Sequence, residues 1–186
     1  MRLMKRSLLV LTALALTASA HAADTFKIDP SRSTIAFKVR HMLGTASGKF
    51  ARFNGTIQVN REHPEQSSVS VSIDPASIDT GIAKRDEHLR SGLFEVARFP
   101  EITFKSRRVK QTGENSGEIV GDLTMHGVTR EIVLKVEDVS KTGTRFRVTT
   151  PPLKRSQFGL VFSKSAETVS MIADEIAVEL EIEGRR

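Results

Sequence analysis

Three histidines, His41, His88 and His126, each end or interrupt a segment that is predicted to be ordered. Three imidazoles that converge can hold a zinc ion. No two of these histidines share the short local spacing of a zinc motif, so we expect no metal site. We interpret them as polar groups near a ligand headgroup or as structural hydrogen-bonding groups.

The densest charged segment runs from residue 84 to residue 90 and reads Lys-Arg-Asp-Glu-His-Leu-Arg. One interpretation is a solvated helix face with ordinary charge pairs between neighbouring turns. The other is that Arg85, Asp86 and His88 line the mouth of a pocket. Asp86 and His88 are also residue types that perform acid–base chemistry. No nucleophile lies near them in the sequence, so we expect no catalytic residue.

Motifs of common enzyme classes are absent from the sequence. It contains no Gly-x-Ser-x-Gly elbow and no His-Glu-x-x-His zinc helix. Residues 44–50 faintly resemble a phosphate-binding loop, but the spacing is one residue short and Phe50 stands where Ser or Thr must reach magnesium. We interpret this stretch as a turn leading into a strand, and we predict that the protein is not an enzyme.

The elements that must position these side chains are mostly strands, because apolar and polar residues alternate repeatedly after residue 22. The alternating apolar residues are Ile35, Phe37 and Val39; Val69, Val71 and Ile73; Ile102 and Phe104; Ile132, Leu134 and Val136; and Ile176, Val178, Leu180 and Ile182. Further strands are predicted over 48–53, 56–60, 118–125, 145–150 and 169–173. Between two of these runs, Asn54-Gly55 predicts a tight hairpin turn.

One segment, residues 82–96, lacks this alternation and contains helix formers. The remaining strands, at their regular spacing, favour a sandwich or a barrel, and a barrel removes exposed sheet edges. We therefore predict an all-β fold of antiparallel strands, a barrel rather than a sandwich, with a short helical insertion around residues 82–96. Such a barrel has an interior for side chains or one small ligand.

The N-terminus has the layout of a secretory signal peptide. Basic residues precede an apolar run from Leu8 to Leu16, and Ala20-His21-Ala22 supplies a small-residue cleavage site. The apolar run is shorter than the roughly 20 residues of a membrane-spanning helix, which disfavours the alternative of an uncleaved anchor. We predict removal of residues 1–22, a single domain over residues 23–186, and a periplasmic or secreted location.

Composition excludes several further functions. The chain has no cysteine, which rules out disulfides, thiolate metal sites and a cysteine nucleophile. Cleavage of the leader removes three basic residues from a chain whose formal net charge is +6. The remaining charge is too small and too mixed to favour nucleic acid as a partner, and no Trp or Tyr offers a stacking platform.

All ten phenylalanines lie after residue 22. A filled core and a ligand cavity both need such residues, and composition does not separate them. For a ligand cavity, the alternation assigns the apolar tunnel lining to Phe37, Val39, Phe50, Phe53, Leu89, Leu93, Phe94, Phe99, Phe104, Leu123, Met125, Phe158 and Phe162. The predicted polar mouth consists of Arg40, His41, Arg85, Asp86, His88 and His126.

Several stretches in order resemble the YceI-like family of polyisoprenoid-binding proteins over nearly the whole mature chain. They are residues 26–33, 37–41, 48–50, 53–57, 77–81, 84–91, 99–106, 121–129 and 155–160. The most specific is Lys-Arg-Asp-Glu-His-Leu-Arg-Ser, followed by Gly-Asp-Leu-Thr-Met-His-Gly-Val-Thr. Two departures remove acidic residues that the family often carries, because Gly92 and Gln157 stand in their places.

The resemblance implies a lipocalin-like, eight-stranded antiparallel barrel with a short helical insertion. It also implies an apolar tunnel that takes an isoprenoid chain, such as a prenyl quinone or a polyprenyl phosphate. We expect no cofactor beyond such a bound lipid, and we consider transient membrane contact and a homodimer as further interactions. Two rival hypotheses remain, namely a stress-related structural or interaction barrel without cargo, and an enzyme that modifies a bound lipid. The lipid carrier is favoured over both. Its support is the family resemblance rather than the chemistry of a site.

Overall fold

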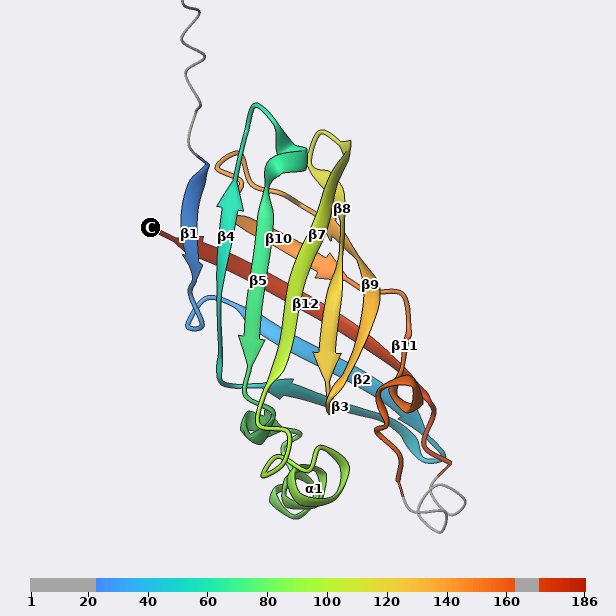
Figure 1. The fold of residues 1–186 in the computed structure, drawn as a ribbon. Helices are drawn as coiled ribbons and strands as arrows, with labels where there is room; N and C mark the ends of the chain where they lie inside the picture. Colours follow the sequence, from blue (N-terminus) through green and yellow to red (C-terminus); the bar gives the residue numbers. More distant parts are fainter. Residues whose placement is uncertain (1–22, 163–170) are drawn as a thin grey trace, which may run out of the picture.

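The computed structural model describes residues 23–162 and 171–186 of the chain. The predicted signal peptide lies outside these residues. Eight antiparallel strands close into a barrel, which confirms the predicted fold (Figure 1). Their order around the barrel is β1 (Asp24–Ile28), β4 (Phe53–Val59), β5 (Ser68–Ile73), β7 (Ile102–Gly113), β8 (Ser116–Met125), β9 (Val128–Glu137), β10 (Arg145–Thr149) and β12 (Glu175–Arg185), which pairs back with β1.

Four shorter or peripheral strand segments extend the wall of the barrel. They are β2 (Thr34–His41), which pairs with β12; β3 (Gly44–Phe50), which pairs with β2; β6 (Ile78–Asp79), which pairs with β3; and β11 (Leu153–Lys154), which pairs with β12. Single 3-10 turns connect other segments: η1 (Pro64–Gln66), η2 (Pro75–Ser77) and η4 (Arg155–Phe158).

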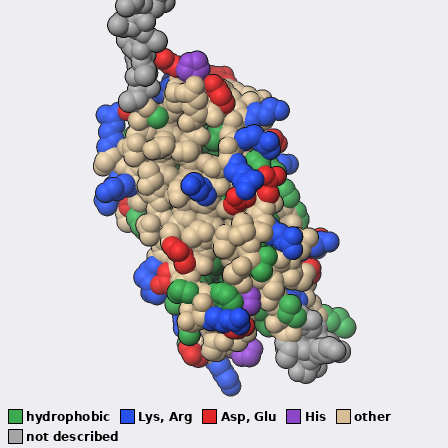
Figure 2. All heavy atoms as spheres, in the orientation of Figure 1, with side chains coloured by type: hydrophobic (Ala, Val, Ile, Leu, Met, Phe, Trp, Pro, Cys, Tyr) green, Lys and Arg blue, Asp and Glu red, His purple; other side chains and the backbone are tan. Residues whose placement is uncertain are grey.

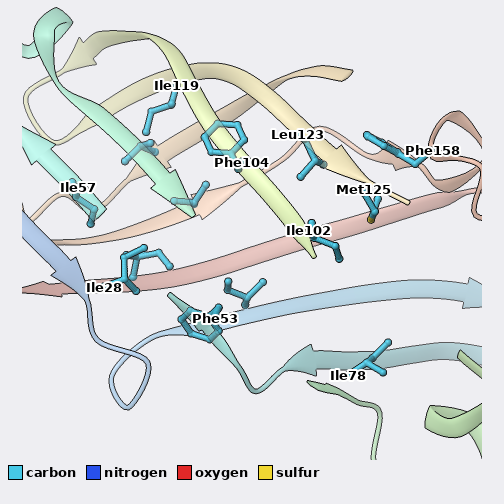
Figure 3. Close-up of a cluster of buried hydrophobic side chains, with 14 of the residues drawn as sticks. Ile28, Phe53, Ile57, Ile78, Ile102, Phe104, Ile119, Leu123, Met125 and Phe158 are labelled. Atoms are coloured by element: carbon cyan, nitrogen blue, oxygen red, sulfur yellow. The ribbon is translucent and has the colours of Figure 1, made fainter. Parts of the chain in front are cut away.

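Strand alternation determines which side chains enter the barrel. In β12, Ile176, Val178 and Leu180 lie on the wall of an internal cavity. Between them, Glu179 faces outward and pairs with Lys38 of β2 at 3.2 Å. Figure 3 shows side chains from opposite walls directed into the space between them. The two-residue period of the sequence therefore predicted the inner face of this strand correctly.

The predicted helical insertion is present between β6 and β7. It consists of α1 (Ala83–His88) and a π-helical turn, η3 (Leu89–Leu93), and it lies at one end of the barrel (Figure 1). No helix in the described parts of the chain is long and apolar enough to cross a bilayer. We call the end that carries this insertion the insertion end.

Two local predictions were wrong, and of the strand predicted over 169–173 the described part, residues 171–173, is not a strand. The strand predicted over 48–53 is interrupted, since β3 ends at Phe50 and β4 begins at Phe53. The hairpin predicted at Asn54-Gly55 does not form, because both residues lie inside β4 and pair with β5. A Cβ on Gly55 would lie 2.6 Å from the Ser70 carbonyl oxygen. Gly55 thus permits close strand packing rather than a turn.

The barrel is filled at one end and hollow at the other. The buried residues that lie off the cavity wall include Phe26, Ile57, Ile119, Val136 and Phe146. They come from the starts of β1, β8 and β10 and from the ends of β4 and β9, which antiparallel pairing brings to the same end. This end opposes the insertion end, so the free space must open towards the insertion.

Candidate functional site

The candidate site is the internal cavity, which has a volume of about 530 Å³. This volume falls within the range of pockets that hold small molecules. Its wall is built from aliphatic and aromatic side chains of β2, β5, β7, β8, β9 and β12 and of the insertion. His88 is both part of the wall and exposed to solvent, so the cavity reaches the surface at the insertion end.

Most of the predicted tunnel residues lie on this wall. They are Phe37, Val39, Phe50, Leu89, Leu93, Phe94, Phe104, Leu123, Met125, Phe158 and Phe162. Phe53 and Phe99 lie off the wall. Phe53 is buried in the core beside the cavity, and the Phe99 ring packs on His126 outside it, with ring centroids 4.2 Å apart.

Three aromatic rings link the insertion to the barrel wall. Phe37 of β2 lies 5.6 Å from Phe50 of β3, measured between ring centroids. Phe50 contacts Phe94, which follows η3, edge to face at 6.0 Å. Such pairs add stability beyond the area that they bury. The insertion is therefore held against the cavity by aromatic contacts as well as by polar ones.

The polar contacts of the insertion centre on Thr80. Arg85 donates hydrogen bonds from Nε to the Thr80 hydroxyl at 2.7 Å and from Nη2 to the Thr80 carbonyl at 2.8 Å. Arg90 donates to the carbonyl oxygens of Ala76 and Ile78. Arg85 and Arg90, which could also have formed a solvated helix face, thus attach the insertion to β6 and to the residues on either side of it.

The predicted polar mouth is only partly assembled. His41, Arg85 and His88 lie on the cavity wall, whereas Arg40, Asp86 and His126 do not. Arg40 is exposed, because β2 alternation turns it outward next to inward-facing Val39. Asp86 is buried and accepts hydrogen bonds from Thr80. Their expected contact with a ligand therefore has no support from the cavity geometry.

His126 has a structural position that the sequence did not indicate. With Gly127 it forms the two-residue turn between β8 and β9, and both residues have positive φ, 52° and 74°. That geometry is typical of a type I′ hairpin. The His126 ring lies against Phe99, with Nε2 3.3 Å from Oε1 of Glu95. His126 thus links the segment after the insertion to the β8–β9 turn.

Arg155 is a wall residue that the predicted site lacked. Its guanidinium is buried and donates to the carbonyl oxygens of Leu160 at 2.8 Å and of Ala173 at 3.2 Å. It also lies over the Phe162 ring, 5.0 Å from the centroid. The buried cation is therefore satisfied by backbone oxygens, and it fixes the two segments on either side of residues 163–170.

Asp174 stabilises the same region as Arg155. Desolvation acts to raise the pKa of its carboxyl, but hydrogen bonds from the hydroxyl and the N–H of Ser156 and the charge of Arg155 outweigh it, so the pKa is lowered. Ser156 donates these bonds at 2.7 Å and 2.9 Å. The ionised carboxylate thereby anchors η4 to the start of β12.

Other wall residues were missed although a signal existed for most of them. The aliphatic ones belong to the alternating runs and include Ile35, Val69, Val71, Ile73, Ile132, Leu134, Val178 and Leu180. Extending each run's inner face to the tunnel would have found them. Thr80, Thr150 and Arg155 carry no such periodic signal. Gly92 and Gln157, where acidic residues of the family are replaced, are exposed and lie off the wall.

Within residues 23–162 and 171–186, no group of three or more His, Asp or Glu side chains is placed to hold a metal ion. His41 Nδ1 instead accepts a hydrogen bond from the Leu43 N–H at 3.3 Å. The cavity itself is suited to an apolar guest, because few polar groups reach it and most of those already have partners.

Comparisons with known proteins agree with this geometry. The family model for the YceI-like domain matches residues 26–184. Protein YceI of Escherichia coli is 37% identical over 140 residues, which cover 72% of this chain and 73% of that protein. The crystal structure of BcnA from Burkholderia cenocepacia aligns with a TM-score of 0.75 at 24% identity, over 83% of this chain and 98% of that one.

A further similar structure is described as a polyisoprenoid binding domain from Saccharophagus degradans implicated in plant cell wall breakdown. It aligns with a TM-score of 0.62 at 21% identity, over 89% of this chain and 100% of that one. At this identity the likeness shows a shared fold.

Proposed function

The chain belongs to the YceI-like domain family, and from that premise we propose that it binds a long-chain polyisoprenoid or related apolar lipid in its cavity and sequesters or carries it. The observation that supports this proposal is the cavity of about 530 Å³ with its apolar wall, which reaches solvent at the insertion end. The lipid is the only bound group that we propose, and it is cargo rather than a cofactor.

The binding free energy of such a cargo comes mainly from its tail. Each buried methylene contributes roughly 0.8 kcal/mol, while ordering of the tail and loss of its freedom oppose binding. A prenyl quinone and a polyprenyl phosphate both offer such a tail. We therefore expect tail length to govern affinity more than headgroup chemistry does.

A binding role is better supported than a catalytic one. Asp86, the carboxylate considered for acid–base chemistry, is buried off the cavity wall and accepts hydrogen bonds from Thr80. His126 faces Glu95 and Phe99. The two side chains are thus engaged in contacts that hold the insertion and its following segment in place.

We propose that the protein is exported and meets membranes at the insertion end. The large hydrophobic side chains that are exposed in the described residues are Met42, Leu43, Ile82, Val161 and Met171. We call these five residues the apolar rim. Each lies within two residues in sequence of a cavity-wall residue. In Figure 2, hydrophobic side chains lie on the surface of the lower end, where Figure 1 places the insertion.

A lipid bilayer is the partner that best fits the apolar rim. An isoprenoid that leaves the cavity into water loses the free energy of its buried methylenes. Contact of the rim with a bilayer removes that penalty, and apolar side chains at a surface insert readily into the headgroup region. A homodimer through the same rim is the competing arrangement, and the vesicle experiment described in the Discussion separates the two.

Native mass spectrometry of the protein purified from a periplasmic extract, followed by denaturing lipid analysis, tests the proposal. We expect a stoichiometric prenyl lipid, or its uptake when a prenyl quinone is added to the empty protein. A protein that is empty and refuses added prenyl lipids would instead favour the interaction barrel without cargo. Turnover of an added lipid that is lost in His88→Ala would favour the enzyme.

A further inference from the structure

Thr150 lies on the cavity wall, and its side-chain hydroxyl is buried and has no hydrogen-bond partner. It is the only such side-chain nitrogen or oxygen among the residues that the structure describes. Thr150 directly follows β10, and its backbone N–H donates to the Val178 carbonyl at 3.3 Å. The backbone of this residue is therefore fixed while its side-chain oxygen is unsatisfied.

The cross-strand neighbours of Thr150 are apolar. The preceding residue, Thr149, is opposite Lys135 of β9 and Glu179 of β12. One step further along both ladders lie Leu134 and Val178, which line the cavity. Neither side chain can hydrogen-bond. The oxygen itself has almost no accessible surface, so it meets a ligand in the cavity when the side chain rotates about its Cα–Cβ bond.

The other polar side chains of the wall do not share this situation. Thr80 and Arg85 bond to each other, and Arg155 donates to backbone carbonyls. His41 accepts a hydrogen bond from a neighbouring N–H, while His88 is exposed to solvent. Among the described residues of the wall, the Thr150 hydroxyl alone is buried with an unused donor and acceptor.

We propose that Thr150 is a polar subsite that hydrogen-bonds an uncharged oxygen atom of the cargo, such as a carbonyl, ether or hydroxyl. This inference rests on the proposed function and specifies its ligand as an oxygen-bearing isoprenoid. A buried hydroxyl without a partner is unfavourable, and a ligand oxygen removes that penalty. A phosphate fits this position poorly, because burial of an anion needs a cation or several donors.

The substitution Thr150→Val tests the subsite, since it removes the hydroxyl and nearly preserves the shape. The protein is titrated with a ubiquinone and with squalene, an all-hydrocarbon isoprenoid, the two having the same number of isoprene units. We expect Thr150→Val to weaken quinone binding about five- to tenfold, the worth of one hydrogen bond. Squalene binding should be unchanged or stronger, and Thr150→Ser should restore quinone binding.

A second readout needs no ligand. Thr150→Val removes an unsatisfied buried hydroxyl, so the ligand-free protein should melt at a higher temperature than wild type. A lower melting temperature would show that the hydroxyl has a partner in the protein and would overturn the subsite. Equal weakening of both ligands, or of neither, would also overturn it. Failure of wild-type protein to bind either ligand would instead overturn the proposed lipid-binding function.

Discussion

The hydroxyl and the backbone N–H of Thr80 both donate hydrogen bonds to the same carboxylate oxygen of Asp86, the latter at 3.0 Å. The two residues bracket the start of α1. Thr80 also accepts from Arg85, which follows on the helix. A buried carboxylate thus holds the loop that leads into the insertion, and the insertion forms part of the cavity wall.

Replacement of this carboxylate should loosen the insertion. Asp86→Ala leaves the Thr80 donors without their acceptor, so we expect a loss of about 1–3 kcal/mol in the free energy of unfolding. Hydrogen exchange should become faster over residues 80–94. Glu87→Ala is the matched control, because Glu87 is exposed and pairs only weakly with Arg90 at 3.8 Å. Equal effects of the two substitutions would contradict the role of Asp86.

The close approach of β4 and β5 gives a second prediction. In Gly55→Ala the added methyl group would meet the Ser70 carbonyl at 2.6 Å and the Ile28 side chain at 2.7 Å. We expect destabilisation of about 1–3 kcal/mol by chemical denaturation. Gly92→Ala serves as the control, since the added methyl group would lie 3.8 Å from the nearest atom, Cε1 of His88, and a helical alanine is favourable. A tolerated Gly55→Ala would mean that the strands can separate without cost.

The barrel could be predicted because its strands alternate strictly. In β2, β5 and β12, period-two patterns place Phe37, Val71 and Val178 on the inner face, as the structure has them. The Asn54-Gly55 pair misled, since its composition suits a turn equally well. Gly55 lies in a strand rather than a turn because it packs closely against Ser70, which is 15 residues away in sequence. No local pattern contains that contact.

The cavity wall was more predictable than its polar groups. Apolar wall residues follow from alternation, whereas polar ones depend on tertiary contacts. Asp86 and His126 were predicted to lie at the ligand, but their side chains hydrogen-bond to Thr80 and to Glu95, respectively. Thr150 gave no signal at all, because its importance lies in the lack of a partner. That property exists only once β9, β10 and β12 are assembled.

Acid should destabilise the barrel through Glu183. A hydrogen bond from Arg145 lowers the pKa of Glu183 below its ordinary value; desolvation opposes this shift, and the charges of Arg145 and Arg32 reinforce it. A carboxyl whose folded-state pKa is lowered contributes stability that is complete above its unfolded pKa and is lost as pH falls through the folded value.

Glu183→Gln should therefore be less stable at pH 7 and should lose less stability on acidification between about pH 5 and pH 2. Denaturation midpoints measured across this range check the difference in slope. Glu179→Gln is the control on the same face of β12, where an exposed pair with Lys38 contributes little. Parallel pH profiles for wild type and Glu183→Gln would show that Glu183 does not contribute to the loss of stability in acid.

The apolar rim should govern contact with membranes. Met42 and Leu43 form the turn between β2 and β3 and are 57% and 85% exposed. A Met42→Ser, Leu43→Ser double variant should bind phospholipid vesicles several-fold more weakly in co-sedimentation, because it removes apolar area that enters the headgroup region. Its melting temperature should be nearly unchanged.

Sedimentation velocity of the same variant distinguishes a bilayer from a second copy of the chain. A wild-type dimer that the double variant abolishes, together with vesicle binding that does not change, would assign the rim to self-association. A monomer with weakened vesicle binding and slower transfer of a prenyl quinone between vesicles is the result that we expect.

Partial filling of the cavity should shorten the tail that it accepts. Ala46 of β3 lies on the cavity wall, whereas the next residue, Ser47, is exposed on the outer face. Ala46→Phe places a ring in free space, so it should cost little stability but remove room for methylenes worth roughly 0.8 kcal/mol each. Wild-type affinity should rise with the number of isoprene units, and in Ala46→Phe this rise should stop at a shorter tail.

Ser47→Phe is the control for this prediction, because it adds the same ring outside the cavity and should leave the length dependence as in wild type. Isothermal titration with prenyl quinones of increasing length makes the comparison. Equal affinity of wild-type protein for short and long tails would contradict tail-governed binding, because an apolar cavity of this size must reward each methylene that it buries.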